Sequence, residues 1–164
     1  MKGCVSEGLT PVVIAILLPF IVVYVVVYLI LRGLMWVGLT LAVWVLWLPR
    51  GKNTLFVYSD SPNWHDYIAE NILSKIERRC VVLNWSERSR WQNSASLAAG
   101  VFMFFGGDRE FNPMAVVFRP LRAPRTVRFF QAFRDHKHGK PEGLHKAEAE
   151  LYRLVGCESS AEDA

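Results

Sequence analysis

Two stretches of the chain carry side chains that could do chemistry, and the first is a short polar loop. Residues 59–65 read SDSPNWH, and the residues of interest in it are Ser59, Asp60, Ser61 and His65. His65, with Asp66 beside it, could transfer a proton, and free amides at the start of a helix attract anions. Serine and aspartate are also the residues that cap helices, so capping alone explains every residue type in this loop.

The second stretch has an arginine at every third position. It contains Arg119, Arg122, Arg125 and Arg128, with Pro120 and Pro124 between them. The prolines favour an extended segment or a hairpin loop. In polyproline II, a three-residue period lines the guanidinium groups along one edge, where they can pair with phosphates or carboxylates. This pattern predicts contact with anionic lipid or with an acidic protein partner. A solvated loop whose charges aid solubility explains it equally well.

Other chemistries find little support in the sequence. The run DHKHGK over residues 135–140 places lysines beside histidines, and the lysines would repel a metal ion. The Gly106-Gly107 pair is too short for a glycine-rich phosphate loop and is typical of a helix end. The aromatic residues beside the arginines fit strand positions better than a base-stacking surface. We therefore predict no catalytic residue, no metal, no cofactor and no nucleic acid partner.

The amino-terminal third of the chain is strongly apolar and predicts an integral membrane protein. Between Leu9 and Leu48, the residues outside the apolar set are Thr10, Pro11, Pro19, Arg32, Gly33, Gly38 and Thr40. At about 1.5 Å per residue, the uncharged run 10–31 is long enough to cross the ~30 Å hydrocarbon core as a helix. Its length exceeds the apolar core of a cleaved signal peptide, which favours a permanent anchor.

A second apolar run, over residues 34–48, raises the question of how both runs fit into one bilayer. A single straight helix over both runs would reach about 60 Å, twice the thickness of the hydrocarbon core. Arg32 and Gly33 form the one polar, flexible point between the runs. The pattern therefore predicts a transmembrane helical hairpin, with helices at about 10–31 and 34–48. The positive-inside rule then favours both termini in the cytoplasm.

Beyond this anchor of residues 1–49, the chain reads as alternating strands and helices. We expect strands at 54–59, 80–85 and 114–118, where short apolar runs are rich in β-branched and aromatic residues. Helices are expected over 62–79, 94–105 and 144–155, and residues 126–133 could form a strand antiparallel to the third one. This order predicts an α/β domain over residues 50–155. An acidic, disordered tail is expected over 156–164.

The order of these elements resembles the thioredoxin-like fold over residues 54–155. In that family, the loop after the first strand carries the redox cysteines, and a cis-proline precedes the third strand. The matching stretches here are FVYSDSPNWHDY and FNPMAVVF, with Pro113 at the proline position. Serines and an aspartate occupy the loop, and a hydroxyl cannot form the disulfide that exchange chemistry requires. The resemblance implies the fold, and Pro113 as a ligand position, without the oxidoreductase activity.

A doubly wound, flavodoxin-like sheet is the alternative fold. It would need a third crossover helix at the point where the sequence favours a hairpin between the last two strands. Both folds place a ligand at the loop after the first strand. The fold class is α/β in either case.

The charge of the domain is unevenly distributed. Residues 50–140 carry 15 basic and 8 acidic side chains, whereas residues 141–164 carry 2 basic and 6 acidic ones. Cys4, Cys80 and Cys157 are odd in number and widely spaced, which does not indicate the disulfide framework of an extracellular domain. We therefore predict a multi-pass protein of a cell membrane, the bacterial inner membrane being the expected one, with the domain on the cytoplasmic side.

These observations support two functions. The first is a non-catalytic interaction module that contacts anionic lipid or an acidic protein partner through the arginine segment. The alternative is a small membrane-bound enzyme or ligand-binding protein that uses residues 59–65 on a phosphorylated or thiol substrate. Because two short membrane spans often pack against others, we also expect a membrane-protein partner.

Overall fold

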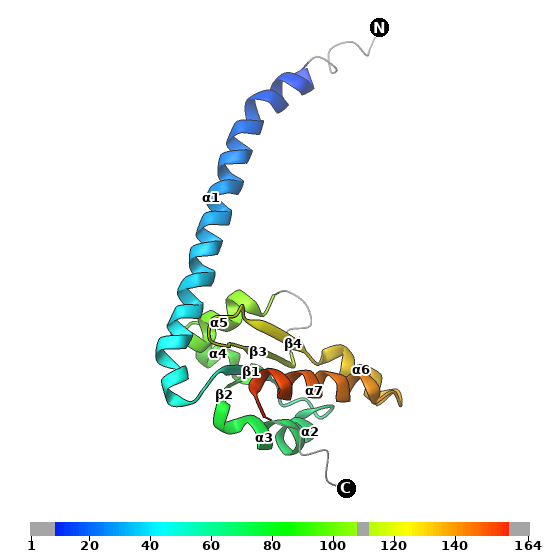
Figure 1. Cartoon of the computed structure of the whole chain (residues 1–164). Helices are drawn as coiled ribbons and strands as arrows, with labels where there is room; N and C mark the ends of the chain where they lie inside the picture. Colours follow the sequence, from blue (N-terminus) through cyan, green and yellow to red (C-terminus); the bar gives the residue numbers. More distant parts are fainter. Residues whose placement is uncertain (1–8, 108–111, 158–164) are drawn as a thin grey trace. The chain divides into compact units, whose positions relative to one another are not determined.

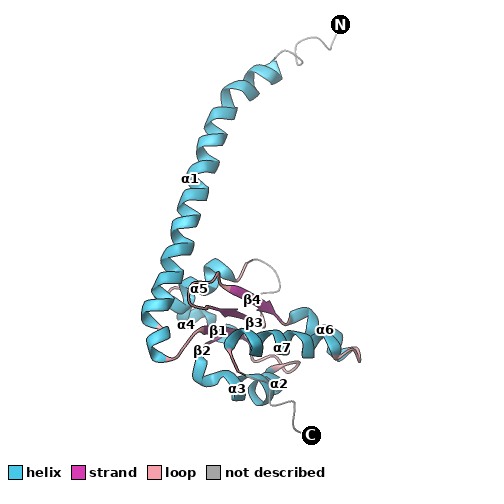
Figure 2. Cartoon of the chain, viewed as in Figure 1, coloured by secondary structure: helices cyan, strands magenta, loops and turns pink. Residues whose placement is uncertain are grey.

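The chain combines one long apolar helix with a mixed α/β domain (Figures 1 and 2). The structure is a computed structural model, and it describes residues 9–107 and 112–157. It divides into two units, Met1–Gly38 and Leu39–Ala164. The predicted α/β class is therefore confirmed. The predicted acidic tail lies outside the described residues from position 158 onward.

The apolar amino-terminal run forms a single helix, α1 (Leu9–Leu46), of 38 residues, with Pro19 inside it. In the first unit, every residue of α1 whose burial is described is exposed. By length and composition, α1 can cross a membrane, and it is the one such helix among the described residues. These properties fit a membrane anchor and also an amino-terminal signal sequence.

The predicted transmembrane hairpin is wrong, because α1 passes through Arg32 and Gly33 without a turn. Arginine is a good helix former, and a single glycine costs a helix only about 1 kcal/mol, so neither residue interrupts the hydrogen-bond ladder. The prediction assumed that lipid must cover both apolar runs. Instead, Thr40, Val43 and Trp47 are buried within the second unit. The second run is apolar because part of it belongs to a protein core.

The second unit is built on a four-stranded sheet with the strand order β2-β1-β3-β4. The strands are β1 (Thr54–Tyr58), β2 (Cys80–Asn84), β3 (Met114–Val117) and β4 (Arg125–Arg128). β2 runs parallel to β1, whereas β3 is antiparallel to β1 and β4 is antiparallel to β3. The flavodoxin-like alternative is therefore wrong, because a doubly wound sheet is mostly parallel and joins these strands through helices.

Helices lie on both faces of this sheet. Residues 65–79 form a helical segment composed of α2 (His65–Tyr67), a π-helical stretch (Ile68–Leu73), α3 (Ser74–Ile76) and a 3₁₀ turn (Glu77–Arg79). Further 3₁₀ turns are Leu48–Arg50 and Trp85–Glu87, and the remaining helices are α4 (Arg88–Trp91), α5 (Leu97–Phe105), α6 (Phe130–Lys137) and α7 (Glu142–Val155). The segment 65–79 packs with α6 and α7 in one core, and α5 packs with the last turns of α1 in the other.

The strand predicted over residues 126–133 is wrong beyond Arg128, because α6 begins at Phe130. The aromatic residues in this stretch are Phe129, Phe130 and Phe133. Their spacing of one and four positions fits the period of a helix as well as an apolar strand. Phe129 and Phe133 are both buried, so the helix serves the same core that the strand would have served.

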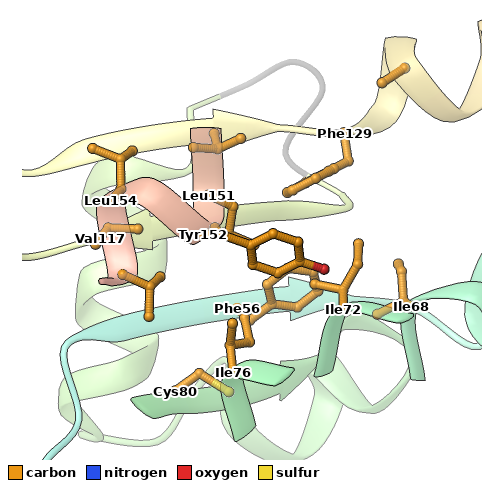
Figure 3. Packing of buried hydrophobic residues seen from close by; sticks show 14 of the residues in the cluster. Phe56, Ile68, Ile72, Ile76, Cys80, Val117, Phe129, Leu151, Tyr152 and Leu154 are labelled. Atoms are coloured by element: carbon orange, nitrogen blue, oxygen red, sulfur yellow. The ribbon is translucent and has the colours of Figure 1, made fainter. Parts of the chain in front are cut away.

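Alternate residues of β1 supply the two cores, as the two-residue period of a strand requires. Phe56 belongs to the core beneath α7, and Leu55 and Val57 belong to the core beneath α5. Figure 3 shows Phe56 packed among side chains from residues 65–79 and α7. Its ring centroid lies 5.9 Å from that of Phe129. On residues 65–79, the buried face consists of Ile68, Ile72 and Ile76, which follow one another at four-residue spacing.

Candidate functional site

The predicted polar loop and Pro113 come to the same edge of the sheet. Tyr58, the last residue of β1, pairs with Asn84 at the end of β2. Val57 pairs with Met114 at the start of β3, directly after Pro113. We call residues 59–65, Asn84, Ser86 and Pro113 the polar edge. Pro113 is buried there, follows a cis peptide bond, and accepts a hydrogen bond on its carbonyl from the Phe129 N–H at 3.0 Å.

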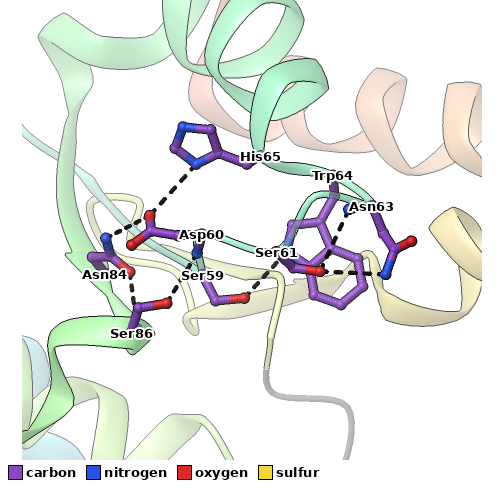
Figure 4. Close-up of polar contacts among 8 residues, drawn as sticks. All are labelled: Ser59, Asp60, Ser61, Asn63, Trp64, His65, Asn84 and Ser86. Carbon is purple, nitrogen blue, oxygen red and sulfur yellow. Dashed lines mark hydrogen bonds and ion pairs between the residues drawn. The ribbon is translucent and has the colours of Figure 1, made fainter.

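A closed ring of hydrogen bonds organises the polar edge around Asp60 (Figure 4). The Asn84 side-chain amide donates to Asp60 Oδ1 at 2.8 Å, and the Asp60 N–H donates to Ser86 Oγ at 3.0 Å. The Ser86 N–H donates to Asn84 Oδ1 at 2.9 Å and closes the ring. These three bonds join the chain leaving β1 to the chain leaving β2.

His65 lies beside Asp60, a different carboxylate from the adjacent Asp66 that the sequence suggested. Its Nδ1 is 3.5 Å from Asp60 Oδ1, and 39% of its side chain is exposed. Its ring centroid lies 5.7 Å from that of Tyr58. Burial, followed by the charges of Asp60 and Glu87, raises the pKa of Tyr58. A histidine with a carboxylate behind it can accept a proton, so this pair is the chemically competent part of the loop.

The two serines of the loop are engaged elsewhere. Ser59 is buried, and its Oγ accepts a hydrogen bond from Trp64 Nε1 at 3.3 Å. Ser61 Oγ accepts from the Asn63 N–H at 3.5 Å and from the Asn63 side-chain amide at 3.3 Å. Figure 4 shows Ser61 beside Trp64 and Asn63, away from the Asp60–His65 pair. The loop therefore does not present a serine to a histidine as nucleophilic catalysis requires.

Sequence reasoning missed Asn84 and Ser86 as partners of the loop. Their sequence positions are more than 20 residues from Asp60, and they approach it because β1 and β2 are parallel neighbours. The signal that could have found them is the strand-helix-strand order, because parallel strands joined by a helix end at one edge of a sheet. Trp64 was expected in the core, and it packs its ring 6.1 Å from that of Phe133.

The arginines lie in a β-hairpin, the second of the two conformations that the prolines favour, so the polyproline II stripe does not form. β4 pairs with β3, so Arg125 and Arg128 are three positions apart on a strand and point to opposite faces of the sheet. Arg128 donates to the Gly106 carbonyl at 2.9 Å, at the end of α5. Arg119 and Arg122 precede the strand, in the turn that joins β3 to β4. The arginines are therefore divided between a hairpin tip and two faces of an edge strand.

The tip of the β3–β4 hairpin lies at the sheet edge opposite to the polar edge. Thr54, the first residue of β1, pairs with Val117, the last residue of β3. The Phe118 N–H then donates to the Asn53 carbonyl at 2.8 Å, and the Phe118 ring packs edge-on against Trp47 with centroids 6.4 Å apart. We call residues 47–53 and 118–124 the anchor edge, because the chain enters the sheet there from α1.

Several basic side chains bind the carbonyls at the ends of helices or strands. Arg50 donates to the Leu46 carbonyl at 2.9 Å, Lys52 to the Cys80 carbonyl at 2.8 Å, and Arg79 to the Val155 carbonyl at 2.7 Å. Cations near the last carbonyls of a helix satisfy its free acceptors and oppose its dipole. Part of the basic excess of the domain is therefore structural, and Arg128 belongs to this group.

A second polar cluster lies beneath α7. Glu148 has a side chain only 12% exposed, with Oε2 3.7 Å from His145 Nδ1. Burial, together with Glu148, raises the pKa of Tyr67, and the same two causes raise the pKa of Tyr152 to about 12. Tyr152 donates to the Asn71 carbonyl at 2.8 Å, so the cluster fastens α7 to the π-helical stretch.

Across residues 9–107 and 112–157, no three histidine, cysteine, aspartate or glutamate side chains gather closely enough to hold a metal ion. Comparison with known proteins finds no matching family model, no similar curated protein and no similar solved structure.

Proposed function

We propose that the chain is a single-pass membrane protein whose α/β domain is a non-catalytic module contacting anionic lipid headgroups. Support begins with α1, where residues 10–31 cover about 33 Å as a helix, close to the thickness of a hydrocarbon core. The second unit begins at Leu39, directly after the exposed part of the helix. Only residues 32–38 separate the proposed span from the second unit, so the span would tether the domain close to the bilayer.

Side chains near the end of the proposed span are suited to a membrane–water boundary. Tyr28, Arg32 and Trp36 follow at intervals of four residues and so share one face of α1. The Arg32 guanidinium donates to the Tyr28 hydroxyl at 3.4 Å. Tyrosine and tryptophan favour this boundary, and a long arginine side chain can reach the headgroups from just below it.

The distribution of charge supports a cytoplasmic domain in this single-pass arrangement. Arg32, Arg50 and Lys52 follow the span, whereas Lys2 precedes it together with the acidic Glu7. The positive-inside rule places the more basic flank in the cytoplasm. A single span then puts the amino terminus on the opposite side, in place of the two cytoplasmic termini expected from a hairpin.

The observation that carries the proposal is the position of the hairpin arginines. Arg119, Arg122 and Arg125 lie at or next to the anchor edge, where the chain arrives from α1. Each basic side chain near an anionic surface contributes about 1 kcal/mol to binding. Tethering by α1 means that this modest attraction needs only to orient the domain, because the anchor already holds it at the membrane.

We also propose that the domain is thioredoxin-like, although without the redox activity. Its four-stranded sheet, with β1 and β2 parallel and β3 antiparallel to β1, supports this assignment. Pro113 occupies the position before β3 that the resemblance implies. Ser59, Asp60 and Ser61 stand in the loop where the family has its redox cysteines, so thiol exchange is not part of the proposal.

A ligand-binding role of the polar edge is the second candidate function. It is favoured by one observation, the half-exposed His65 with Asp60 behind it. The lipid-contact function makes a different prediction for substitutions at each of the two edges. Replacing His65 with alanine should leave lipid contact intact, and reversing the charge of the hairpin arginines should remove it.

The test uses the full-length protein in nanodiscs of phosphatidylcholine with or without phosphatidylglycerol. A nitroxide is attached at Ala123→Cys, an exposed position of the hairpin, with Cys4 and Cys157 replaced by serine; Cys80 is buried. We expect the label to lose mobility when the anionic lipid is present. High salt should reverse the effect, because it screens charges on exposed side chains.

Two charge-reversal variants make the test specific. Arg122→Glu with Arg125→Glu should abolish the lipid-dependent change in label mobility. Arg88→Glu with Arg90→Glu alters the net charge equally at exposed positions of α4 and should leave it in place. Equal mobility in both lipids, or an equal loss in both variants, would contradict the proposal.

A further inference from the structure

The tip of the β3–β4 hairpin holds a leucine where the backbone favours glycine. Leu121 has φ +58°, in the left-handed region that residues with a side chain rarely adopt. The Arg122 N–H donates to the Arg119 carbonyl at 3.2 Å across Pro120 and Leu121. Proline at the second position and a positive φ at the third are features of a type II turn, whose third residue is usually glycine or asparagine. Backbone geometry therefore does not account for this leucine.

Packing against residues 9–107 and 112–157 does not account for this leucine either. The Leu121 residue is 90% exposed, the largest exposed fraction among the described large apolar residues of the domain. The neighbouring Pro120, Arg122 and Ala123 are exposed as well. A leucine that strains its own turn and buries almost none of its surface contributes little to folding. A contact of the Leu121 side chain with a surface outside the described residues would account for it.

The side chains beside Leu121 indicate what kind of surface the tip of the hairpin contacts. Arg119 and Arg122 flank Leu121 on the two sides of the turn. Guanidinium groups pair with phosphate through two parallel hydrogen bonds. A leucine is favourable in the hydrocarbon just below those phosphates. An apolar tip between two arginines therefore matches the polarity profile across an anionic headgroup layer.

The hairpin is held firmly at the anchor edge. Phe118, at its base, is fully buried and packs against Trp47 and against Phe105, with ring centroids 6.4 and 5.6 Å apart. Its N–H is bonded to Asn53 in the segment that arrives from α1. The base of the hairpin is thus fixed to residues 47–53 of the same unit, and it holds the turn at this edge of the sheet.

We propose that Leu121 inserts into the membrane that anchors the chain, with Arg119 and Arg122 binding the phosphates of anionic lipids on either side of it. This inference rests on the proposed function. It adds that the tip of the hairpin enters the bilayer and that Leu121 makes an apolar contact there. Headgroup attraction by arginines alone would leave the tip in water. Insertion places the Leu121 side chain below the phosphates.

The experiment measures the depth of a nitroxide at Leu121→Cys in the full-length protein, with Cys4 and Cys157 replaced by serine. Nanodiscs contain phosphatidylcholine with phosphatidylglycerol, and the probes are dissolved oxygen and a water-soluble nickel complex. Val82→Cys is the matched control, an exposed apolar residue on the edge strand β2. We expect nickel accessibility at position 121 to fall about tenfold relative to position 82, because the hydrocarbon excludes the complex.

A second variant separates insertion from a structural role. Leu121→Gly relieves the turn and should leave the unfolding temperature unchanged or raise it. In that variant the nitroxide at Ala123→Cys should nevertheless move outward, with its nickel accessibility rising several-fold. If Leu121 served only the fold, Leu121→Gly would lower the unfolding temperature and leave the nickel accessibility at position 123 unchanged.

The outcomes distinguish this inference from the proposed function. If the label at Ala123 loses mobility in anionic nanodiscs while the label at Leu121 remains as accessible to nickel as that at Val82, insertion is overturned and headgroup contact stands. If neither label responds to anionic lipid, both proposals fail. A protected label at Leu121 that depends on Arg122 supports both.

Discussion

The two edges of the sheet differ in how well the fold itself explains their residues. At the polar edge, Asp60, Asn84 and Ser86 satisfy one another in a closed ring. At the anchor edge, Leu121 strains its turn and is 90% exposed. The first edge has the residue types usually associated with catalysis, and the second has ordinary ones. The comparison teaches that a residue left unexplained by folding is a stronger functional signal than a reactive residue type.

The basic residues can be compared in the same way, between those whose position the fold explains and those whose position it does not. Arg50, Lys52, Arg79 and Arg128 bind backbone carbonyls, so their presence follows from the fold. The arginines that flank Leu121 have a different setting, at a hairpin tip with no helix end to stabilise. Counting basic residues in the sequence cannot make this distinction. It depends on which carbonyls the fold brings within reach.

The largest expected effect concerns the anchor edge and the end of α1. Trp47→Ala should cost the domain about 3 to 5 kcal/mol of stability, because Trp47 is only 7% exposed and packs against Phe118. Val45→Ala, at a position 68% exposed on the same helix, should cost less than about 1 kcal/mol. Urea unfolding of the full-length protein in nanodiscs measures both. Equal effects would mean that the end of α1 lies in lipid, as the hairpin prediction required.

Cys80, the first residue of β2, gives the stability of the domain a pH dependence. Burial raises the pKa of its thiol from 9.0 to about 11, partly opposed by the nearby Lys52 charge. Above pH 9 the unfolded chain loses this proton while the folded chain keeps it, so stability present below pH 9 is lost as the pH rises toward 11. The loss attributable to this group is roughly 2 to 3 kcal/mol when complete.

Unfolding of Cys80→Val as a function of pH measures this contribution. Its stability should fall less between pH 9 and 11 than that of the natural chain. Val116→Ala, which removes buried volume without a titratable group, should keep the full slope. The tyrosines with raised pKa values, such as Tyr152 at about 12, add a loss above pH 10 in every variant. If Cys80→Val lost stability between pH 9 and 11 as steeply as the natural chain, the loss could not be assigned to the Cys80 thiol.

The polar edge should respond to substitutions as part of the fold. Asn84→Ala opens the hydrogen-bond ring and leaves Asp60 and Ser86 without that partner, which should cost about 1 to 2 kcal/mol of stability. Asn63→Ala, an exposed asparagine of the same loop with longer bonds, is the control and should cost less than about 0.5 kcal/mol. Thermal unfolding compares them. The label at the hairpin tip should report the same lipid contact in both.

Much of the domain could be predicted from local patterns. Short apolar runs rich in β-branched residues gave β1, β2 and β3 within two residues of their ends, and the four-residue spacing of isoleucines gave the buried face of residues 65–79. α6 was missed because its phenylalanines fit two periods at once. Such ambiguity is resolved by tertiary packing, which a single sequence does not display.

The course of α1 and the contacts of the sites were harder to predict, for a different physical reason. An apolar helix beside lipid and one beside a protein core have the same composition, so residues 39–46 could not be told from a second span. The Asp60 ring depends on strand register, and the strain at Leu121 depends on a backbone angle. Neither quantity has a local signature in residue types.

The smallest expected effect is the sharpest test of the comparison between the edges. His65→Ala removes the partly exposed imidazole that lies beside the Asp60 carboxylate at the polar edge. If that edge serves the fold, membrane contact and the biological role of the protein should survive, and stability should change by less than about 1 kcal/mol, because exposed ion pairs contribute little. Arg122→Glu with Arg125→Glu, measured beside it, should leave stability equally intact and abolish lipid contact. If His65→Ala lost the biological role and the arginine variant kept it, the Asp60–His65 pair would be the functional site. The hairpin would then serve only to orient the domain.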